Sequence, residues 1–150
     1  MPDEVEVRID GLPLVSSEEW AKAQRVPESD LPKVDPNRYI ASRRLGLQPV
    51  DDARREYAWN LARESMHRQG EALAERLRDF LANIPGFHLR YVVWDGSRRE
   101  WILVPDTSSV RPVGMTPDLV NRITDPRRFG GTRQDFVELS SLFGIHGAVA

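Results

Sequence analysis

The chain has 150 residues and a formal net charge of −2 at pH 7, a length that allows one ordinary domain or a smaller core with an extended arm. Because proteins that bind nucleic acid generically are usually basic overall, this charge argues against that class. The sequence contains no cysteine, which excludes disulfides and thiolate metal sites.

The N-terminal stretch is acidic and has no apolar signal core. No apolar run approaches the ~18 residues of a membrane span. We therefore expect no signal peptide, no transmembrane segment and no membrane partner, and a cytoplasmic or virion-associated protein. Lys22 and Lys33 are the only lysines, so arginine carries nearly all the positive charge. GC-rich codon usage explains this bias, and so does the preference for arginine at interfaces.

Residues 1–48 are predicted to form an extended arm. Glu4–Ile9 alternates polar and apolar residues, as a half-buried strand does. Ser16 with Glu19 matches a capping box at the start of a short helix. Pro27, Pro32 and Pro36 then exclude a regular helix or a central strand. The apolar residues spaced along the rest of the arm are expected to contact a surface: Leu31, Tyr39, Ile40, Leu45 and Leu47.

A long helix is predicted over residues 49–84, with Asp51 or Asp52 as its N-terminal cap. Its apolar or small residues recur at steps of three or four, which is the helical period: Trp59, Ala62, Met66, Gly70, Leu73, Leu77, Phe80 and Ile84. Glycine costs ~1 kcal/mol relative to alanine in a helix. Gly70 on this stripe therefore predicts that a neighbouring backbone approaches closely there.

The first half of this helix carries a second apolar patch. At ~100° per residue, Val50, Tyr57 and Leu61 fall nearly opposite the main stripe. A helix that is apolar on two sides must be covered on both, either by the chain's own arm or by another subunit or partner. The predicted protein interface consists of Leu31, Tyr39, Ile40, Leu45, Leu47, Val50, Tyr57 and Leu61.

Residues 87–104 contain the strongest hairpin signal, with a turn around Asp95-Gly96. A two- or four-residue loop groups Leu89, Tyr91 and Val93 with Ile102 on one face, opposite a face with Trp94, Trp101 and Leu103. Because an isolated hairpin is marginal in water, we expect a third strand, from Val5–Ile9 or near Val110–Val113.

Two short helices are predicted at the C-terminal end. Thr116 and Pro117 open the first, and Thr132 with Asp135 resembles a capping box that opens the second. The predicted fold is therefore α+β, with one long helix packed on a small antiparallel sheet. The predicted domains are the arm, residues 1–48, and a core domain, residues 49–150.

The stretch between the two C-terminal helices has the strongest features of a binding site. Glycines expose backbone N–H groups at a helix N-terminus, and arginines flank them, a combination that can hold a phosphate or carboxylate. It lacks the spacing and the lysine of a P-loop. A helix cap after a loop explains the same pattern. The predicted anion- or partner-binding residues are Arg127, Arg128, Gly130, Gly131, Thr132 and Arg133.

Other polar residues give no defined site. Glu64, His67 and Glu71 share a helical face, but the second copy that a di-iron site needs is missing from the sequence. His88 and His146 have no evident acid or nucleophile partner, and no serine lies in a nucleophile-elbow pattern. We expect no catalytic residues, no metal and no cofactor.

The expected function is a non-enzymatic structural or adaptor subunit that docks into a larger assembly with a protein partner or a second copy of itself. The passage from the long helix through Ile84-Pro85-Gly86 into a strand resembles small phage head–tail completion proteins, which implies a virion component. The long N-terminal arm departs from that pattern. The alternatives are a nucleic-acid-associated protein that uses its arginine pairs and, less favoured, a small hydrolase. The pairs are Arg43-Arg44, Arg54-Arg55, Arg98-Arg99 and Arg127-Arg128.

Overall fold

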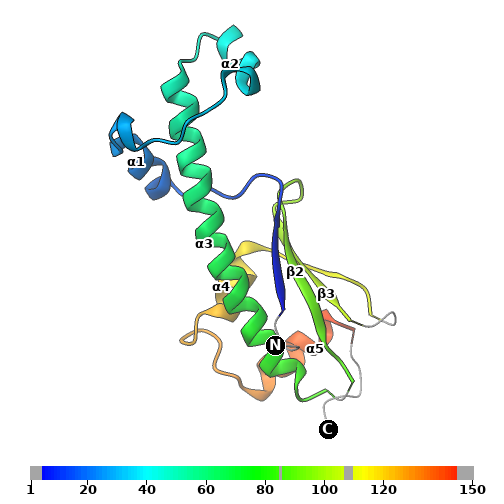
Figure 1. The fold of residues 1–150 in the computed structure, drawn as a ribbon. Coiled ribbons are helices and arrows are strands. Elements are labelled where there is room, and N and C mark those ends of the chain that lie inside the picture. The colour runs from blue at the N-terminus through cyan, green and yellow to red at the C-terminus, as the bar shows by residue number, and fades with distance from the viewer. Residues whose placement is uncertain (1–4, 85, 107–109, 145–150) are drawn as a thin grey trace. The chain divides into compact units, whose positions relative to one another are not determined.

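The computed structural model describes residues 5–84, 86–106 and 110–144 (Figure 1). Pro85 and the C-terminal tail with His146 lie outside these residues. The elements follow the order β1 (Glu6–Asp10), α1 (Ser17–Arg25), η1 (Glu28–Asp30), η2 (Pro36–Tyr39), α2 (Ile40–Arg44), α3 (Pro49–Leu81), β2 (Leu89–Asp95), β3 (Glu100–Pro105), β4 (Val113–Met115), α4 (Pro117–Thr124) and α5 (Arg133–Leu142).

The chain divides into two compact units. The sheet unit consists of Met1–Leu12 with His67–Ala150, and the helical unit of Pro13–Met66. Helix α3 contributes residues to both. The predicted arm is shared between them, because β1 belongs to the sheet unit and the rest of the arm to the helical unit. The predicted division at residue 48 stays a prediction.

The α+β class is confirmed by one long helix and a four-stranded sheet of order β1-β2-β3-β4. The two short C-terminal helices are present as α4 and α5. The prediction of an antiparallel sheet is wrong for one edge, because β1 pairs in parallel with β2 while the other pairs are antiparallel. Parallel neighbours need a long crossover connection, and the chain between β1 and β2, which includes α3, supplies it.

Both segments considered for a third strand are in the sheet, one at each edge of the hairpin (Figure 1). β1 extends one residue beyond the predicted Ile9, to Asp10, and β4 begins at Val113, where the predicted strand ends. Both edges of the hairpin are covered by short strands, so its outward-facing backbone N–H and C=O groups form hydrogen bonds within the sheet. In an isolated hairpin these groups would be exposed to water.

The hairpin has the four-residue loop that was one of the two predicted lengths, since Asp95 pairs with Glu100, and of the predicted face grouping only Leu89 is wrong. A register shift between Leu89 and Tyr91 places Leu89 on the same face as Val92 and Trp94, all three buried. The simple alternation grouped Leu89 with Tyr91 and Val93, which are half-buried on the opposite face. An extra residue in one strand reverses the alternation beyond it.

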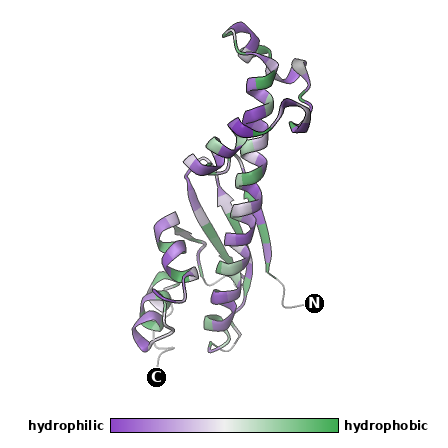
Figure 2. Ribbon diagram, turned by 90° about the vertical axis from the view of Figure 1, so that its left-hand side faces the viewer, coloured by the Kyte–Doolittle hydropathy of each residue, from purple (hydrophilic) through white to green (hydrophobic). Residues whose placement is uncertain are grey.

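The core of the sheet unit forms where α3 meets the sheet. Trp94 and Trp101 are fully buried, with ring centroids 5.9 Å apart in an edge arrangement. Each indole N–H is satisfied, Trp94 by the carbonyl of Leu12 at 3.0 Å and Trp101 by Gln69 Oε1 at 3.3 Å. Figure 2 shows hydrophobic positions alternating with hydrophilic ones along the helix and the strands, as two-sided elements require.

Gly70 allows this contact. A Cβ atom at Gly70 would lie 2.5 Å from Val7 Cγ1 and 2.8 Å from Trp101 Cη2. A close approach at Gly70 is therefore confirmed, but it is made by side chains of β1 and β3 and not by a backbone as predicted. Residues 49–81 form one continuous helix through this position. The local helix signals are confirmed as well, with capping boxes at Ser16 and Thr132 and a side-chain cap at Thr116.

Replacing Gly70 with alanine is expected to destabilise the sheet unit. Overpacking a core costs about 1–3 kcal/mol, which exceeds the gain of up to about 1 kcal/mol from alanine's helix propensity. Urea unfolding followed by tryptophan fluorescence measures the change. Glu71→Ala, at the neighbouring exposed position of the same helix, is the control. A higher unfolding midpoint for Gly70→Ala would show that no close contact exists there.

Candidate functional site

The helical unit holds α2 against α3 through a buried carboxylate. Asp52 on α3 is fully buried, and the Arg55 Nη2 atom donates to its Oδ1 at 3.1 Å. The Arg43 Nη2 atom on α2 lies 2.7 Å from Oδ2, although not in line for a hydrogen bond. Arg43 also donates to the carbonyl of Leu47 at 2.7 Å. The packing of α2 thus depends on a charge that two arginines neutralise.

The prediction that Asp51 or Asp52 is the N-terminal cap is wrong, because α3 begins at Pro49 and both residues lie in its first turn; Asp51 still accepts a hydrogen bond from the residue before the helix. Its Oδ2 accepts the backbone N–H of Gln48 at 2.8 Å, so it stabilises the first turn of α3. Asp52 takes the buried position instead, and the sequence analysis missed the ion pairs it makes. The one local signal for them is the spacing of Asp52 and Arg55, three residues apart on one helical face.

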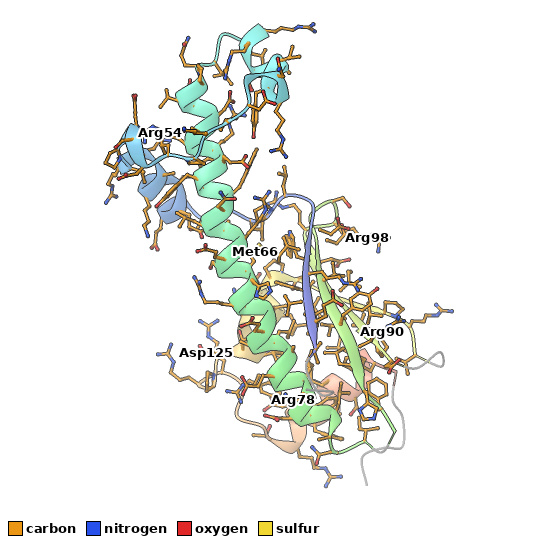
Figure 3. The ribbon with its side chains drawn as sticks, in the orientation of Figure 1. Arg54, Met66, Arg78, Arg90, Arg98 and Asp125 are labelled. Carbon is orange, nitrogen blue, oxygen red and sulfur yellow. The ribbon has the colours of Figure 1, made fainter. Side chains whose placement is uncertain are left out.

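Further polar contacts hold the rest of the helical unit to α3. Tyr39 Oη donates to Glu56 Oε2 at 2.7 Å, and this hydrogen bond raises the pKa of Tyr39 above its ordinary value. Arg54 Nη1 donates to the carbonyls of Ala23 and Val26, both at 2.8 Å, at the C-terminal end of α1 (Figure 3). The segments on either side of α3 are therefore tied to it by polar groups.

Large apolar side chains contribute little to the interior of the helical unit. Its buried apolar residues are Pro13, Ala23, Ala53, Ala58, Ala62 and Met66. Met66 is thus the only large one among residues 13–66. On α2 and the turn after it, Ile40 is 52% exposed and Leu45 80% exposed, whereas Ser42 is buried and Arg43 is paired with Asp52. Ser42 and Arg43 of α2 thus face their own chain, and Ile40 and Leu45 are exposed together with Ala41 and Arg44.

All eight predicted interface residues lie in the helical unit. Ile40 and Leu45 are exposed, and the other six are half-buried: Leu31, Tyr39, Leu47, Val50, Tyr57 and Leu61. Their use as an interface stays a prediction. The sheet unit differs, since it fully buries Leu73, Leu77 and Leu103 as well as its two tryptophans.

The loop between α4 and α5 turns its donors toward its own carboxylates. Arg127 Nε lies 3.4 Å and Arg128 Nε 3.6 Å from the carboxylate of Asp125 (Figure 3 labels Asp125). At the start of α5, the Thr132 N–H and hydroxyl both donate to Asp135 Oδ2, at 2.9 and 3.0 Å. Gly131 adopts a positive φ of 69° next to this cap, which suits glycine.

These contacts engage three of the six predicted anion-binding residues, Arg127, Arg128 and Thr132, within the chain. Gly130, Gly131 and Arg133 are exposed. Whether Arg127, Arg128, Gly130, Gly131, Thr132 and Arg133 bind an anion or a partner stays a prediction. The capping box that sequence reasoning weighed as the simpler explanation is present.

Most of the arginine pairs are also engaged. Arg43 and Arg55 contact Asp52, Arg54 donates to two carbonyls, and Arg98 Nε lies 3.8 Å from Asp95. On the exposed face of α3, His67 Nδ1 lies 3.0 Å from Glu71 Oε1. Over the described ranges, no group of three or more His, Asp or Glu side chains could hold a metal ion.

None of the described helices is long and apolar enough to cross a membrane. Comparison of the chain with models of protein families, with curated proteins and with solved structures gives no match. Any functional conclusion must therefore come from the packing and chemistry of the chain's own residues.

Replacing Asp52 with asparagine is expected to loosen α2 from α3. Removing one partner of a buried ion pair costs about 3–5 kcal/mol. Here the arginine side chains are 29% and 30% exposed, so we expect a smaller loss, on the order of 2 kcal/mol. The hydrogen-exchange protection of residues 36–62 measures this loss of stability. The control is Asp30→Asn, a substitution at an exposed position. Unchanged protection in Asp52→Asn would contradict the proposed dependence on this charge.

The loop carboxylates predict a pH dependence. The backbone N–H of Arg127 and the neighbouring guanidinium groups lower the pKa of Asp125 below 3.8, and the backbone N–H of Thr132 does the same for Asp135. Because both pKa values are lower in the folded chain, their stabilisation is complete above pH 3.8 and is lost as the pH falls below it.

Carboxyl-carbon NMR titration measures both midpoints. We expect both below 3.8, and we expect Thr132→Ala to raise the midpoint of Asp135 and leave that of Asp125 in place. An Asp135 midpoint at or above the ordinary value in the unaltered chain would exclude the capping box in solution.

Proposed function

We propose that the chain is a non-enzymatic structural or adaptor subunit that docks into a larger protein assembly through its helical unit. The observation that carries the proposal is the reversed polarity of α2, with Ser42 and the ion-paired Arg43 turned inward and Ile40 and Leu45 exposed. Single exposed apolar residues are common on protein surfaces. Two of them on a short segment whose polar side is packed inward are better explained by a partner.

The energetics favour the same interpretation. Burying a leucine or isoleucine side chain contributes about 1.5–3 kcal/mol relative to leaving it exposed. The helical unit obtains only part of this gain internally, because its buried apolar residues are Pro13, four alanines and Met66, while its other large apolar side chains, such as Trp20 and Trp59, are half-buried or exposed. A partner surface over Ile40, Leu45 and the half-buried Leu47 would supply it. Residues at the centre of an interface carry most of its affinity when they are fully desolvated.

The charge distribution supports a protein partner over nucleic acid. Residues 13–66 contain nine acidic and nine basic side chains, so the helical unit is formally neutral. Four of its arginine guanidinium contacts go to Asp52 or to backbone carbonyls. Nucleic-acid binding depends on a surplus of free positive charge facing the phosphates. The passage at residues 84–86 that resembles head–tail completion proteins makes a virion one setting for such an assembly.

The test compares the size of the native particle for matched variants. The full chain is expressed at its natural level in its own host, and the particle that contains it is sized by chromatography and light scattering. We expect a particle larger than one chain. The double variant Ile40→Ser/Leu45→Ser should weaken the association about tenfold or more, since each central apolar residue contributes more than about 1 kcal/mol.

The matched control carries the same chemical change elsewhere. Leu12 and Val137 are exposed apolar residues of the sheet unit, 58% and 41% exposed, so Leu12→Ser/Val137→Ser should leave the particle unchanged. If the unaltered chain is a single monomer, both purified and in its host, the proposal is wrong. Equal effects of the two double variants would also overturn it, because the helical unit would then have no special part.

A further inference from the structure

The sheet unit contains a pocket between the last turns of α3 and the start of α5. Its volume is about 180 Å³. At ~30 Å³ per water molecule in the liquid, this is room for a small organic group. Pockets for drug-sized ligands are usually larger, about 300–1,000 Å³. The pocket therefore suits one side chain or a single-ring molecule.

Phenyl rings form much of the pocket wall. Phe80 and Phe129 are buried, at 7% and 8% exposure, and Phe136 is half-buried. The rings of Phe80 and Phe136 lie with centroids 4.7 Å apart at an interplanar angle of 54°. The face of an aromatic ring carries partial negative charge, so a pocket lined by rings attracts cations as well as apolar groups.

The charged side chains around these rings have a net negative sum. Asp79 and Asp135 line the pocket with one cation, Arg76. The two hydrogen bonds from Thr132 both end on Asp135 Oδ2, which leaves the second oxygen of that carboxylate as an acceptor. Among the described residues, Asp79 forms no ion pair through its carboxylate.

The N-terminus of α5, which borders the pocket, does not make the pocket favour an anion. An anion there would bind backbone N–H groups, but the Asp135 carboxylate already accepts the N–H of Thr132, and the Thr132 hydroxyl accepts the N–H of Asp135. The nearby Arg122 is paired with Glu138, and Arg127 and Arg128 contact Asp125. Two of the three arginines that predicted an anion thus lie beside an acid of the chain, and the third, Arg133, is exposed and does not line the pocket.

We propose that this pocket binds a planar organic cation, a guanidinium or amidinium group, between the phenyl rings and the carboxylates of Asp79 and Asp135. A planar delocalised cation stacks on an aromatic face and receives a carboxylate at its edge. The proposal does not depend on the function proposed for the helical unit, because every residue it uses belongs to the sheet unit.

Three probes of nearly equal shape and different charge test the sign of the ligand. Benzamidine is cationic, benzamide neutral and benzoate anionic. The full chain labelled with ¹⁵N is titrated with each and followed by amide shifts. We expect saturable shifts with benzamidine in residues 76–83 and 129–136, and binding at least about fivefold weaker for the other two. Equal or tighter binding of benzoate, or no shifts with benzamidine, would overturn the proposal.

Charge variants of opposite sign separate electrostatics from damage to the fold. Asp79→Asn removes an exposed carboxylate and should weaken benzamidine binding about threefold, as expected for one partly exposed charge contact. Arg76→Gln removes the repelling cation and should tighten it. Asp118→Asn on α4, also exposed, is the matched control and should change nothing. Weakening by both pocket variants would indicate structural damage and not recognition of charge, and would count against the proposal.

A last pair of probes distinguishes the source of the cation. N-acetyl-L-arginine amide presents the guanidinium as a polypeptide does, and N-acetyl-L-norleucine amide is its uncharged control. Binding of the arginine derivative with an affinity similar to benzamidine supports an arginine side chain of a partner. Binding of benzamidine alone supports a free aromatic cation. If neither cation binds, the pocket has no such ligand.

Discussion

The sheet unit depends on the close approach of α3 to the sheet at Gly70. Val7 of β1 and Trp101 of β3 occupy the space that a side chain at this position would need. Gln69, one residue earlier, accepts the indole N–H of Trp101 and donates to Asn121 of α4. One turn of helix thus connects two strands and a second helix. Interiors packed to this density tolerate little change in volume.

The helical unit is held together in a different way. Its central group is the carboxylate of Asp52, fully buried between Arg43 and Arg55. Arg54 and Tyr39 add directional hydrogen bonds to α1 and α3. Buried ion pairs give less net stability than well-packed apolar groups, but they specify geometry. In this unit Ile40 and Leu45 are exposed, and the partner proposed for them would cover these side chains.

Short-range carboxylate contacts organise the loops of both units. Asp35, Asp95, Asp125 and Asp135 each accept a backbone N–H two or three residues away. Two of these acids also contact arginines, Asp95 with Arg98 and Asp125 with Arg127 and Arg128. Much of the positive charge that draws attention in the sequence therefore closes turns. The charged side chains that line the pocket near α5 have a net negative charge, which favours a cation over the anion that the sequence predicted.

The sequence by itself determined the features that depend on neighbours a few residues apart. The helical period identified α3, the capping boxes identified α1 and α5, and β-branched and aromatic residues identified the hairpin. Contacts between distant residues decided the rest. Strand direction, the register shift after Leu89 and the burial of Asp52 depend on which segments meet in space. The periodicity of a segment shows which of its sides is apolar. It does not show which other segment packs against that side, because the packing of the whole chain determines this.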